Sequence, residues 1–280
     1  KLQIARMMHE QLEFTKEKYS EVKGDEPVSH ILGIAEEAIF DFTSLLTDND
    51  DAPQKVFSDV EERLDELSSA PIDQVGIPTG FGRYDFAIGG GLRKGTVHVI
   101  GARPKTGKTL FAENAGIYIA HKLGIPVLNL DTEMMRKDHQ DRGIAMLTEV
   151  AINDIETGQF ASNSYKNQKI RDTAEKVKDI PYYHKSIGGK PFEDQLSIMR
   201  RWLAKEVGVN AQGKSNDCVI IYDYLKIMDS ADISGDMKEY QALGFLMTSL
   251  HNFAIRYEVP VLAFVQLNRD GINKESTDTA

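Results

Sequence analysis

From residue 96 onwards, short runs of apolar residues alternate with longer segments in which apolar residues recur every three or four positions. The short runs predict buried β-strands and the periodic segments predict helices. Strands separated by helices predict an α/β fold, with a mostly parallel twisted sheet flanked by helices on both faces. The expected strands are 96–101, 127–131, 181–184, 218–223 and 261–266. The expected helices are 110–123, 135–148, 163–178, 191–207 and 239–257.

The residues before this region follow a different pattern, in which narrow apolar stripes run through charged helical segments. One stripe covers residues 5–12, a second follows Pro27 over 31–42, and a third follows a helix-start signal at Asp51 and Pro53. Helices with such narrow stripes need a partner to cover them.

A stretch rich in Pro, Gly and Thr, residues 71–82, marks the boundary between the two patterns. We therefore predict two parts: a helical N-terminal remnant with a linker helix over 1–68, and an α/β domain over 69–280. The chain opens at Lys1 rather than Met, which favours a fragment of a longer protein.

Composition narrows the class of protein. A hydrophobic content of 41% and a charged content of 27% are typical of a globular protein without a membrane span. The single cysteine, Cys218, excludes an internal disulfide, and no signal-peptide pattern opens the chain, so we expect a cytoplasmic protein. The net charge of −10 argues against a surface coated for nucleic acid, but permits a protein that grips it through a few loops.

The strongest chemical signal lies between the strand at 96–101 and the helix that begins at Leu110. A strand, a loop containing Gly-Lys-Thr and a helix form the setting of a phosphate-binding P-loop. Backbone N–H groups and the helix N-terminus attract phosphate oxygens there, while a lysine reaches the outer phosphates and a hydroxyl binds Mg²⁺. The loop residues are Ala102, Arg103, Pro104, Lys105, Thr106, Gly107, Lys108 and Thr109.

Three further strands end in polar residues, at the sheet edge where ligands bind in parallel α/β folds. The run 218–223 ends in Asp223, the Walker B pattern of a Mg²⁺-binding carboxylate. The strand at 127–131 leads into Asp131 and Glu133, either of which fits the group that polarises an attacking water. A structural alternative is that Asp131 or its neighbour caps the following helix. Gln266, at the end of the last strand, fits a contact to the terminal phosphate.

With these pieces in place, the chain resembles the ATPase portion of DnaB-type replicative helicases, within the RecA-like P-loop ATPases. The general P-loop pattern begins with glycine, where this chain has Ala102. The family's own P-loop also opens with Ala-Arg-Pro, which accounts for this departure. Segments 130–134, 221–225 and 266–269 are similar to the family's Glu-Met strand end, Walker B strand and sensor motif. Thr106 and Lys226 depart from the family pattern, which fits a phage-encoded or divergent member.

The resemblance implies a hexameric ring around single-stranded DNA, with ATP and Mg²⁺ at each subunit interface. It assigns Glu133 as the water-activating carboxylate, and places Arg142 near the phosphates with Gln266 at the terminal phosphate. It also implies an arginine finger from the neighbouring subunit, and primase and a helicase loader as partners. Neither that arginine nor the family's DNA-binding loop is recognisable by Ala280, so we expect a C-terminally incomplete domain.

Other functions remain open at this level. A recombinase-like or clock-type ring or filament ATPase without unwinding activity carries nearly the same motifs. A P-loop kinase for a small molecule is disfavoured, because residues 124–180 show no arginine-rich lid. A nucleotide-gated scaffold that does not hydrolyse ATP is the third alternative.

Overall fold

The computed structural model describes residues 2–20, 22, 28, 32–34, 36–37, 55–71, 74–226 and 239–267. Within these residues, five strands form one sheet in the order β1-β5-β4-β2-β3, and every neighbouring pair is parallel. The predicted α/β class and parallel sheet are confirmed. The strands are β1 (Val97–Ala102), β2 (Val127–Asp131), β3 (Tyr182–Ser186), β4 (Val219–Leu225) and β5 (Val261–Gln266).

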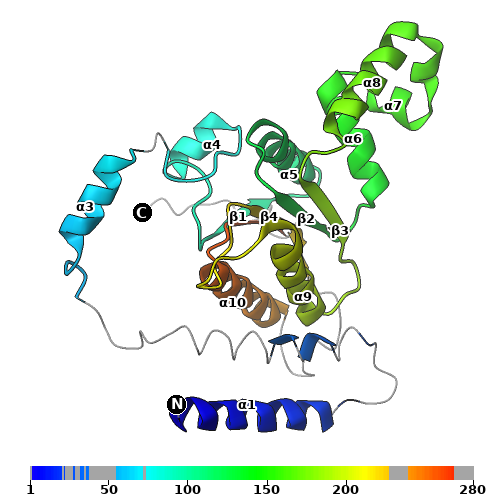
Figure 1. The fold of residues 1–280 in the computed structure, drawn as a ribbon. Helices are drawn as coiled ribbons and strands as arrows, with labels where there is room; N and C mark the ends of the chain where they lie inside the picture. The colour runs from blue at the N-terminus through cyan, green and yellow to red at the C-terminus, as the bar shows by residue number, and fades with distance from the viewer. Residues whose placement is uncertain are drawn as a thin grey trace, which may run out of the picture.

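Helices cover both faces of this sheet (Figure 1). Two separate apolar cores lie between the layers. One core packs α9 and α10 against the sheet, and the other packs α5 against the opposite face. Neighbouring strand residues alternate between the cores: Ile220 and Tyr222 face α9 and α10, while Val219 and Ile221 face α5. This period of two is what a strand buried on both faces requires.

The five long helical segments lie within a few residues of their predicted bounds. The first begins two residues early, at Lys108 directly after the P-loop, and both it and the fourth end in a π-helical turn. The segments are α5 (Lys108–Ile117) with η1 (Tyr118–Lys122), α6 (Arg136–Thr148), α8 (Ser164–Val177), α9 (Phe192–Trp202) with η3 (Leu203–Val207), and α10 (Glu239–Tyr257).

Three short helices were not predicted. They are α4 (Gly82–Ala87), α7 (Ile152–Glu156) and the 3-10 turn η2 (Gln159–Ser162). None is long enough to show a helical apolar period, which explains why the sequence pattern did not reveal them. Within α4, the buried carboxylate of Asp85 accepts hydrogen bonds from the backbone N–H and the hydroxyl of Thr79, at 2.9 and 2.7 Å.

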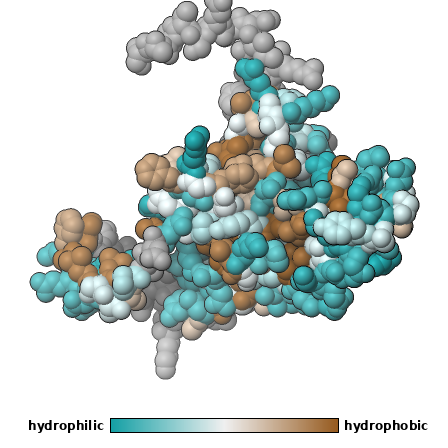
Figure 2. All heavy atoms as spheres, turned by 90° about the horizontal axis from the view of Figure 1, so that it is seen from above, coloured by the Kyte–Doolittle hydropathy of each residue, from teal (hydrophilic) through white to brown (hydrophobic). Residues whose placement is uncertain are grey.

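The N-terminal part contains α1 (Leu2–Ser20) and α3 (Val60–Ser69). Residues 56–59 form a turn, so α3 begins later than the helix-start signal at Asp51 and Pro53 predicts. Asp51 and Pro53 lie outside the described residues. The same is true of Phe42, at the end of the second predicted stripe, and of Asn268, in the predicted sensor motif. No residue of α3 is buried, and Leu64 is 59% exposed. Figure 2 shows the apolar atoms of this helix uncovered at the left of the molecule.

One ion pair joins the N-terminal helical segment to the α/β domain: Glu36 lies 3.4 Å from Arg201 of α9. A second lies within the N-terminal segment, where Glu37 is 3.2 Å from Lys18 of α1. Ile77, within the Pro- and Gly-rich boundary stretch, pairs with Leu92 in an isolated antiparallel bridge. This bridge connects the boundary stretch to the α/β domain. Among the helices that the structure describes, none is both long and apolar enough to cross a bilayer.

Candidate nucleotide site

The carboxyl ends of four strands meet at one edge of the sheet. The parallel register sets Ala102 of β1 beside Gln266 of β5, and Asp131 of β2 beside Asp223 of β4. Leu267 also donates its backbone N–H to the carbonyl of Ala102, at 3.0 Å. The predicted P-loop, Walker B carboxylate, Glu133 turn and sensor amide therefore occupy adjacent strand ends.

The loop from β1 to α5 has the shape of an anion cradle. Lys105 and Gly107 have positive φ angles of 62° and 99°, which turn the chain sharply into the helix. The carbonyl of Arg103 accepts hydrogen bonds from the hydroxyl and the backbone N–H of Thr106, at 2.7 and 3.4 Å. The first N–H groups of α5 have no carbonyl partner within the helix, so they and the helix dipole attract an anion.

Lys108, the first residue of α5, reaches across to β4. Its Nζ lies 3.4 Å from Asp223 Oδ1 and 3.4 Å from the centroid of the Tyr224 ring. Burial raises the pKa of Asp223, and the Thr109 hydroxyl and the Lys108 charge pull it down only in part, so that it stays above its ordinary value. The sequence-predicted pair of lysine and Walker B carboxylate is thus in contact.

The oxygen atoms of Thr109 and Asp223 suit Mg²⁺, which prefers hard oxygen ligands. Asp223 is 3% exposed, and its Oδ1 forms the ion pair with Lys108 but meets no hydrogen-bond criterion with the described residues. Within the described ranges, no three His, Cys, Asp or Glu side chains gather into a metal-binding group. A cation at Asp223 would therefore take its remaining ligands from phosphate and water, as Mg²⁺ does in nucleotide sites.

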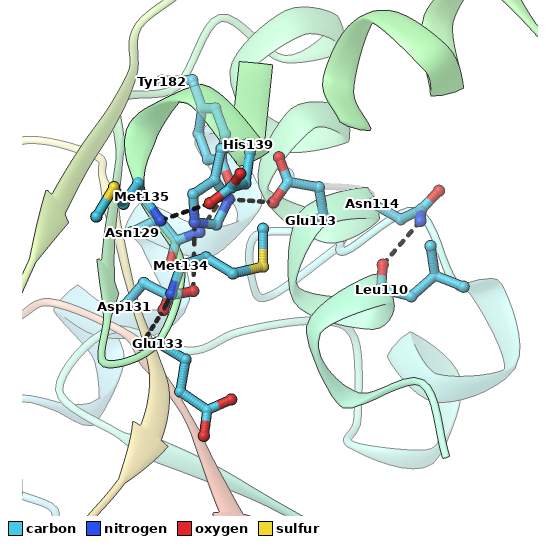
Figure 3. Close-up of polar contacts among 11 residues, drawn as sticks. Leu110, Glu113, Asn114, Asn129, Asp131, Glu133, Met134, Met135, His139 and Tyr182 are labelled. Atoms are coloured by element: carbon cyan, nitrogen blue, oxygen red, sulfur yellow. Dashed lines mark hydrogen bonds and ion pairs between the residues drawn. The ribbon is translucent and has the colours of Figure 1, made fainter. Parts of the chain in front are cut away.

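The carboxylates of Asp131 and Glu133, on either side of the turn after β2, point in different directions (Figure 3). Asp131 Oδ1 accepts the backbone N–H groups of Glu133 and Met134, each at 2.6 Å. The Glu133 carboxylate points away from Asp131. Burial, followed by the influence of the Glu133 carboxylate, raises the pKa of Tyr224.

The alternative that Asp131 caps the next helix is wrong in detail. The residue before α6 is Met135, whose backbone N–H donates to Asp138 at 2.9 Å. Asp131 instead stabilises the turn that precedes the helix, because its Oδ1 accepts the backbone N–H groups of Glu133 and Met134.

Two predicted site residues stand apart from these contacts. Gln266 is exposed at the end of β5, and Arg142 is exposed on α6. Neither takes part in the ion pair between Lys108 and Asp223. Their predicted contacts to phosphate remain predictions.

The sequence did not reveal a buried polar cluster behind the turn. His139 of α6 lies between Glu113 of α5 and Asp131 of β2, and Tyr182 joins the cluster from β3 (Figure 3). One signal was present: Glu113 lies three and four residues from Gly116 and Ile117, which places an acidic side chain on the inward face of α5. Its partner comes from a distant segment, which no local pattern identifies.

Comparison with known proteins agrees with this geometry. The DnaB-like helicase C-terminal domain family matches residues 76–278. A replicative DNA helicase DnaB from Pasteurella multocida is 30% identical over 249 residues, which is 86% of this chain and 50% of that protein. The DnaB of Haemophilus influenzae is 31% identical over 246 residues, 85% of this chain and 50% of that protein. The chain thus spans about half the length of the curated relatives that it matches.

Two solved structures share the fold. A DnaB-like replicative helicase, described with its interactions with primase, superposes with a TM-score of 0.66 at 17% identity, covering 99% of this chain and 61% of that one. A second solved structure, which is described as an ATPase domain, gives a TM-score of 0.67 at 19% identity, covering 81% of this chain and 76% of that one. With the family match spanning most of its length and the P-loop and Walker B residues in contact, this chain belongs to the DnaB-like helicase C-terminal domain family.

Proposed function

We propose that the chain is the ATP-hydrolysing motor of a replicative DNA helicase that moves along single-stranded DNA. The observation that carries this proposal is the contact between Lys108 and Asp223, whose Nζ and Oδ1 atoms lie 3.4 Å apart. Glu133 lies at the same edge of the sheet. A phosphate seated on the N-terminus of α5 would lie within reach of all three side chains, because their strands end side by side.

Each residue has a role that its position supports. Lys108 and the loop N–H groups bind the β- and γ-phosphates, and the N-terminus of α5 adds its dipole. Glu133 orients and deprotonates the attacking water, since its carboxylate is directed away from the backbone bonds that occupy Asp131. Arg142 and Gln266 contact the terminal phosphate as charge develops on it.

Mg²⁺ is the cofactor that the donor set supports. Thr109 and Asp223 would hold it, the latter through its buried Oδ1 or through a bound water. When bound, the ion neutralises charge on the phosphate oxygens of ATP. The neighbours of Asp223, Lys108 and the Thr109 hydroxyl, are donors, so a cation at the carboxylate would take the place of the lysine charge.

We further propose that six copies form a ring in the cytoplasm, with an arginine finger supplied to each site by the neighbouring subunit. The uncovered stripe on α3 supports assembly, because Val60, Leu64 and Leu67 are 40%, 59% and 42% exposed. The relatives of known name are replicative helicases, and one structural neighbour is described with its interactions with primase, so primase and a loader are the expected protein partners.

The test is ATP hydrolysis by the chain with and without single-stranded DNA, run beside light scattering after size exclusion. We expect hydrolysis to be stimulated by DNA in a species near six subunits. Lys108→Ala should lower phosphate affinity, and Glu133→Gln should lower kcat by about 10²–10⁴-fold while ATP still binds. Glu175→Gln is the matched control, since it removes an exposed carboxylate on α8 and should keep the wild-type kcat.

Three results would contradict the proposal. Turnover of Glu133→Gln at the wild-type rate would remove the water-activating role. A monomer whose activity ignores DNA and consumes a small phosphate acceptor would indicate a kinase. ATP binding without hydrolysis in the assembled wild type would indicate a scaffold.

A further inference from the structure

A buried charged cluster lies behind the turn that carries Glu133. Glu113, His139 and Asp131 are 2%, 5% and 2% exposed. His139 Nδ1 lies 2.6 Å from Glu113 Oε2, and His139 Nε2 lies 3.2 Å from Asp131 Oδ2. The imidazole therefore bridges two carboxylates that come from different elements, α5 and β2 (Figure 3). None of these side chains has a role in the function proposed above.

The surroundings of His139 favour its charged form. Burial lowers the pKa of His139, but the bonds and charges of Asp131 and Glu113 outweigh it and raise the pKa to about 9. His184, whose ring centroid lies 4.4 Å away, stays neutral because burial and the charge on His139 lower its pKa to about 4. The groups that face His139 are Glu113 from α5, Asp131 from β2, Tyr182 and His184 from β3, and Arg136 from its own helix.

The charge on His139 has a direct structural consequence at Asp131. Burial alone would raise the pKa of Asp131, but His139 and the backbone N–H groups of Met134 and Glu133 hold it below its ordinary value. One carboxylate oxygen faces His139, and the other accepts both N–H groups of the turn. A carboxylate held in this way fixes the backbone at Glu133, and with it the direction of the side chain.

The same cluster reaches the P-loop helix. Glu113 follows Lys108 by five residues on α5, and the nearby Tyr182 hydroxyl, whose pKa burial and the Glu113 charge raise, accepts a hydrogen bond from Asn129 at 3.0 Å. His139 thus links the helix that binds phosphate to the turn that carries the water-activating group. A cavity of about 420 Å³ between α6, α8 and β3 is lined by His139 and His184.

We propose that His139 is a positioning residue for ATP hydrolysis, whose bridge between Glu113 and Asp131 holds the Glu133 turn in register with the P-loop helix. This inference rests on the proposed role of Glu133. It assigns to His139 no contact with ATP or water. Its effect is therefore expected in kcat rather than in nucleotide affinity.

The experiment compares wild type, His139→Gln and His184→Gln in ATP hydrolysis with single-stranded DNA, alongside binding of a fluorescent non-hydrolysable ATP analogue. We expect His139→Gln to lower kcat about tenfold or more, with analogue affinity within about twofold. Wild-type kcat should also decline as pH rises through about 9, a limb that His139→Gln should lack. His184→Gln is the matched control, since it removes a neutral imidazole from the same cavity and should retain wild-type kcat.

Glu113→Gln supplies a second measurement, which decides the matter if His139→Gln does not fold. It removes one of the two charges that stabilise the imidazolium, so the alkaline limb should move to lower pH. A variant that only loosened the fold would leave the position of that limb unchanged. An unmoved limb in Glu113→Gln would overturn the proposal.

The outcomes separate this inference from the function on which it rests. Loss of hydrolysis in Glu133→Gln together with wild-type kcat in His139→Gln would overturn the positioning role and leave the motor function standing. Wild-type turnover in Glu133→Gln would overturn the function itself. Equal losses of kcat in His139→Gln and His184→Gln would show that hydrolysis depends only on filling this cavity with the two side chains. That result would also overturn the positioning role of His139.

Discussion

The charged state of His139 predicts a pH dependence of folding stability that can be isolated by one substitution. The pKa of this imidazole is about 9 in the folded protein, above its ordinary value of 6.5. A group whose folded pKa is raised stabilises the protein fully below the unfolded pKa and loses that contribution as pH rises through the folded value. The contribution of His139 should therefore be complete below about pH 6.5 and absent above about pH 9.

The magnitude follows from the two pKa values. A difference of one pKa unit corresponds to about 1.4 kcal/mol, so the separation between 6.5 and about 9 gives about 3 kcal/mol of unfolding free energy. His139 is buried, so solvent screens this interaction little. Truncating it leaves two buried carboxylates without their shared cation, which adds a penalty that does not depend on this titration.

The assay is urea unfolding of wild type and His139→Gln at a series of pH values. Subtracting the two free energies of unfolding cancels the other titrating groups that both proteins share. The difference should be larger by about 3 kcal/mol at about pH 6 than at about pH 10, with the change centred between those values. A difference that stays constant within about 0.5 kcal/mol over this range would refute the reasoning.

Tyr224→Phe should lower kcat about tenfold, or about 1.4 kcal/mol, at unchanged analogue affinity, because the ring stays beside the P-loop lysine while the hydroxyl, whose pKa burial and the Glu133 carboxylate raise, is removed. Equal kcat in both proteins would show that the hydroxyl is not needed. Gly116→Ala should destabilise the fold by about 1–3 kcal/mol, since the added Cβ would lie 2.7 Å from a tyrosine ring on β3. Gly244→Ala, with nothing within 4 Å of the added Cβ, should stabilise it by about 0.5–1 kcal/mol. A raised urea midpoint for Gly116→Ala would contradict the first prediction, and a lowered midpoint for Gly244→Ala would contradict the second. Asp85→Ala should cost about 2–3 kcal/mol, because two donors from one buried threonine lose their acceptor, and an unchanged midpoint would contradict this.

Most of the sheet was predictable from the sequence because its strands are buried on both faces. Continuous apolar runs bounded by glycine or polar residues leave little ambiguity in such a sheet, and all five expected strands are present. Even so, β4 continues to Leu225, two residues beyond the predicted end at Asp223. Tyr224 and Leu225 are 8% and 6% exposed, so the strand carries on because both side chains still pack inside the domain.

The edge of the sheet was predictable for a topological reason. Parallel strands joined by helices place all their carboxyl ends together, so the proximity of Lys108 and Asp223 follows from the fold class. The different roles proposed for Asp131 and Glu133 could not be predicted from the fold class, because both residues lie near the end of β2. Only the bonds of the turn, which depend on exact backbone direction, give the two carboxylates different orientations.

The buried cluster was beyond local patterns. Glu113 and His139 lie 26 residues apart on helices whose relative placement is set by tertiary packing. A single histidine in a charged segment carries no signal of its own, and the cost of burying it alone would be prohibitive. Its partners become evident only when α5, α6 and β2 are assembled around one point.

In the contact between Lys108 and Asp223, the group proposed to bind phosphate and the group proposed to bind the cation neutralise each other. A phosphate that draws the ammonium away exposes the carboxylate to a cation, and a cation at the carboxylate releases the ammonium toward phosphate. The two ligands must therefore raise each other's affinity by the same factor, since such linkage is reciprocal. In the proposed function, the ion pair between Lys108 and Asp223 would therefore make the binding of ATP and Mg²⁺ cooperative.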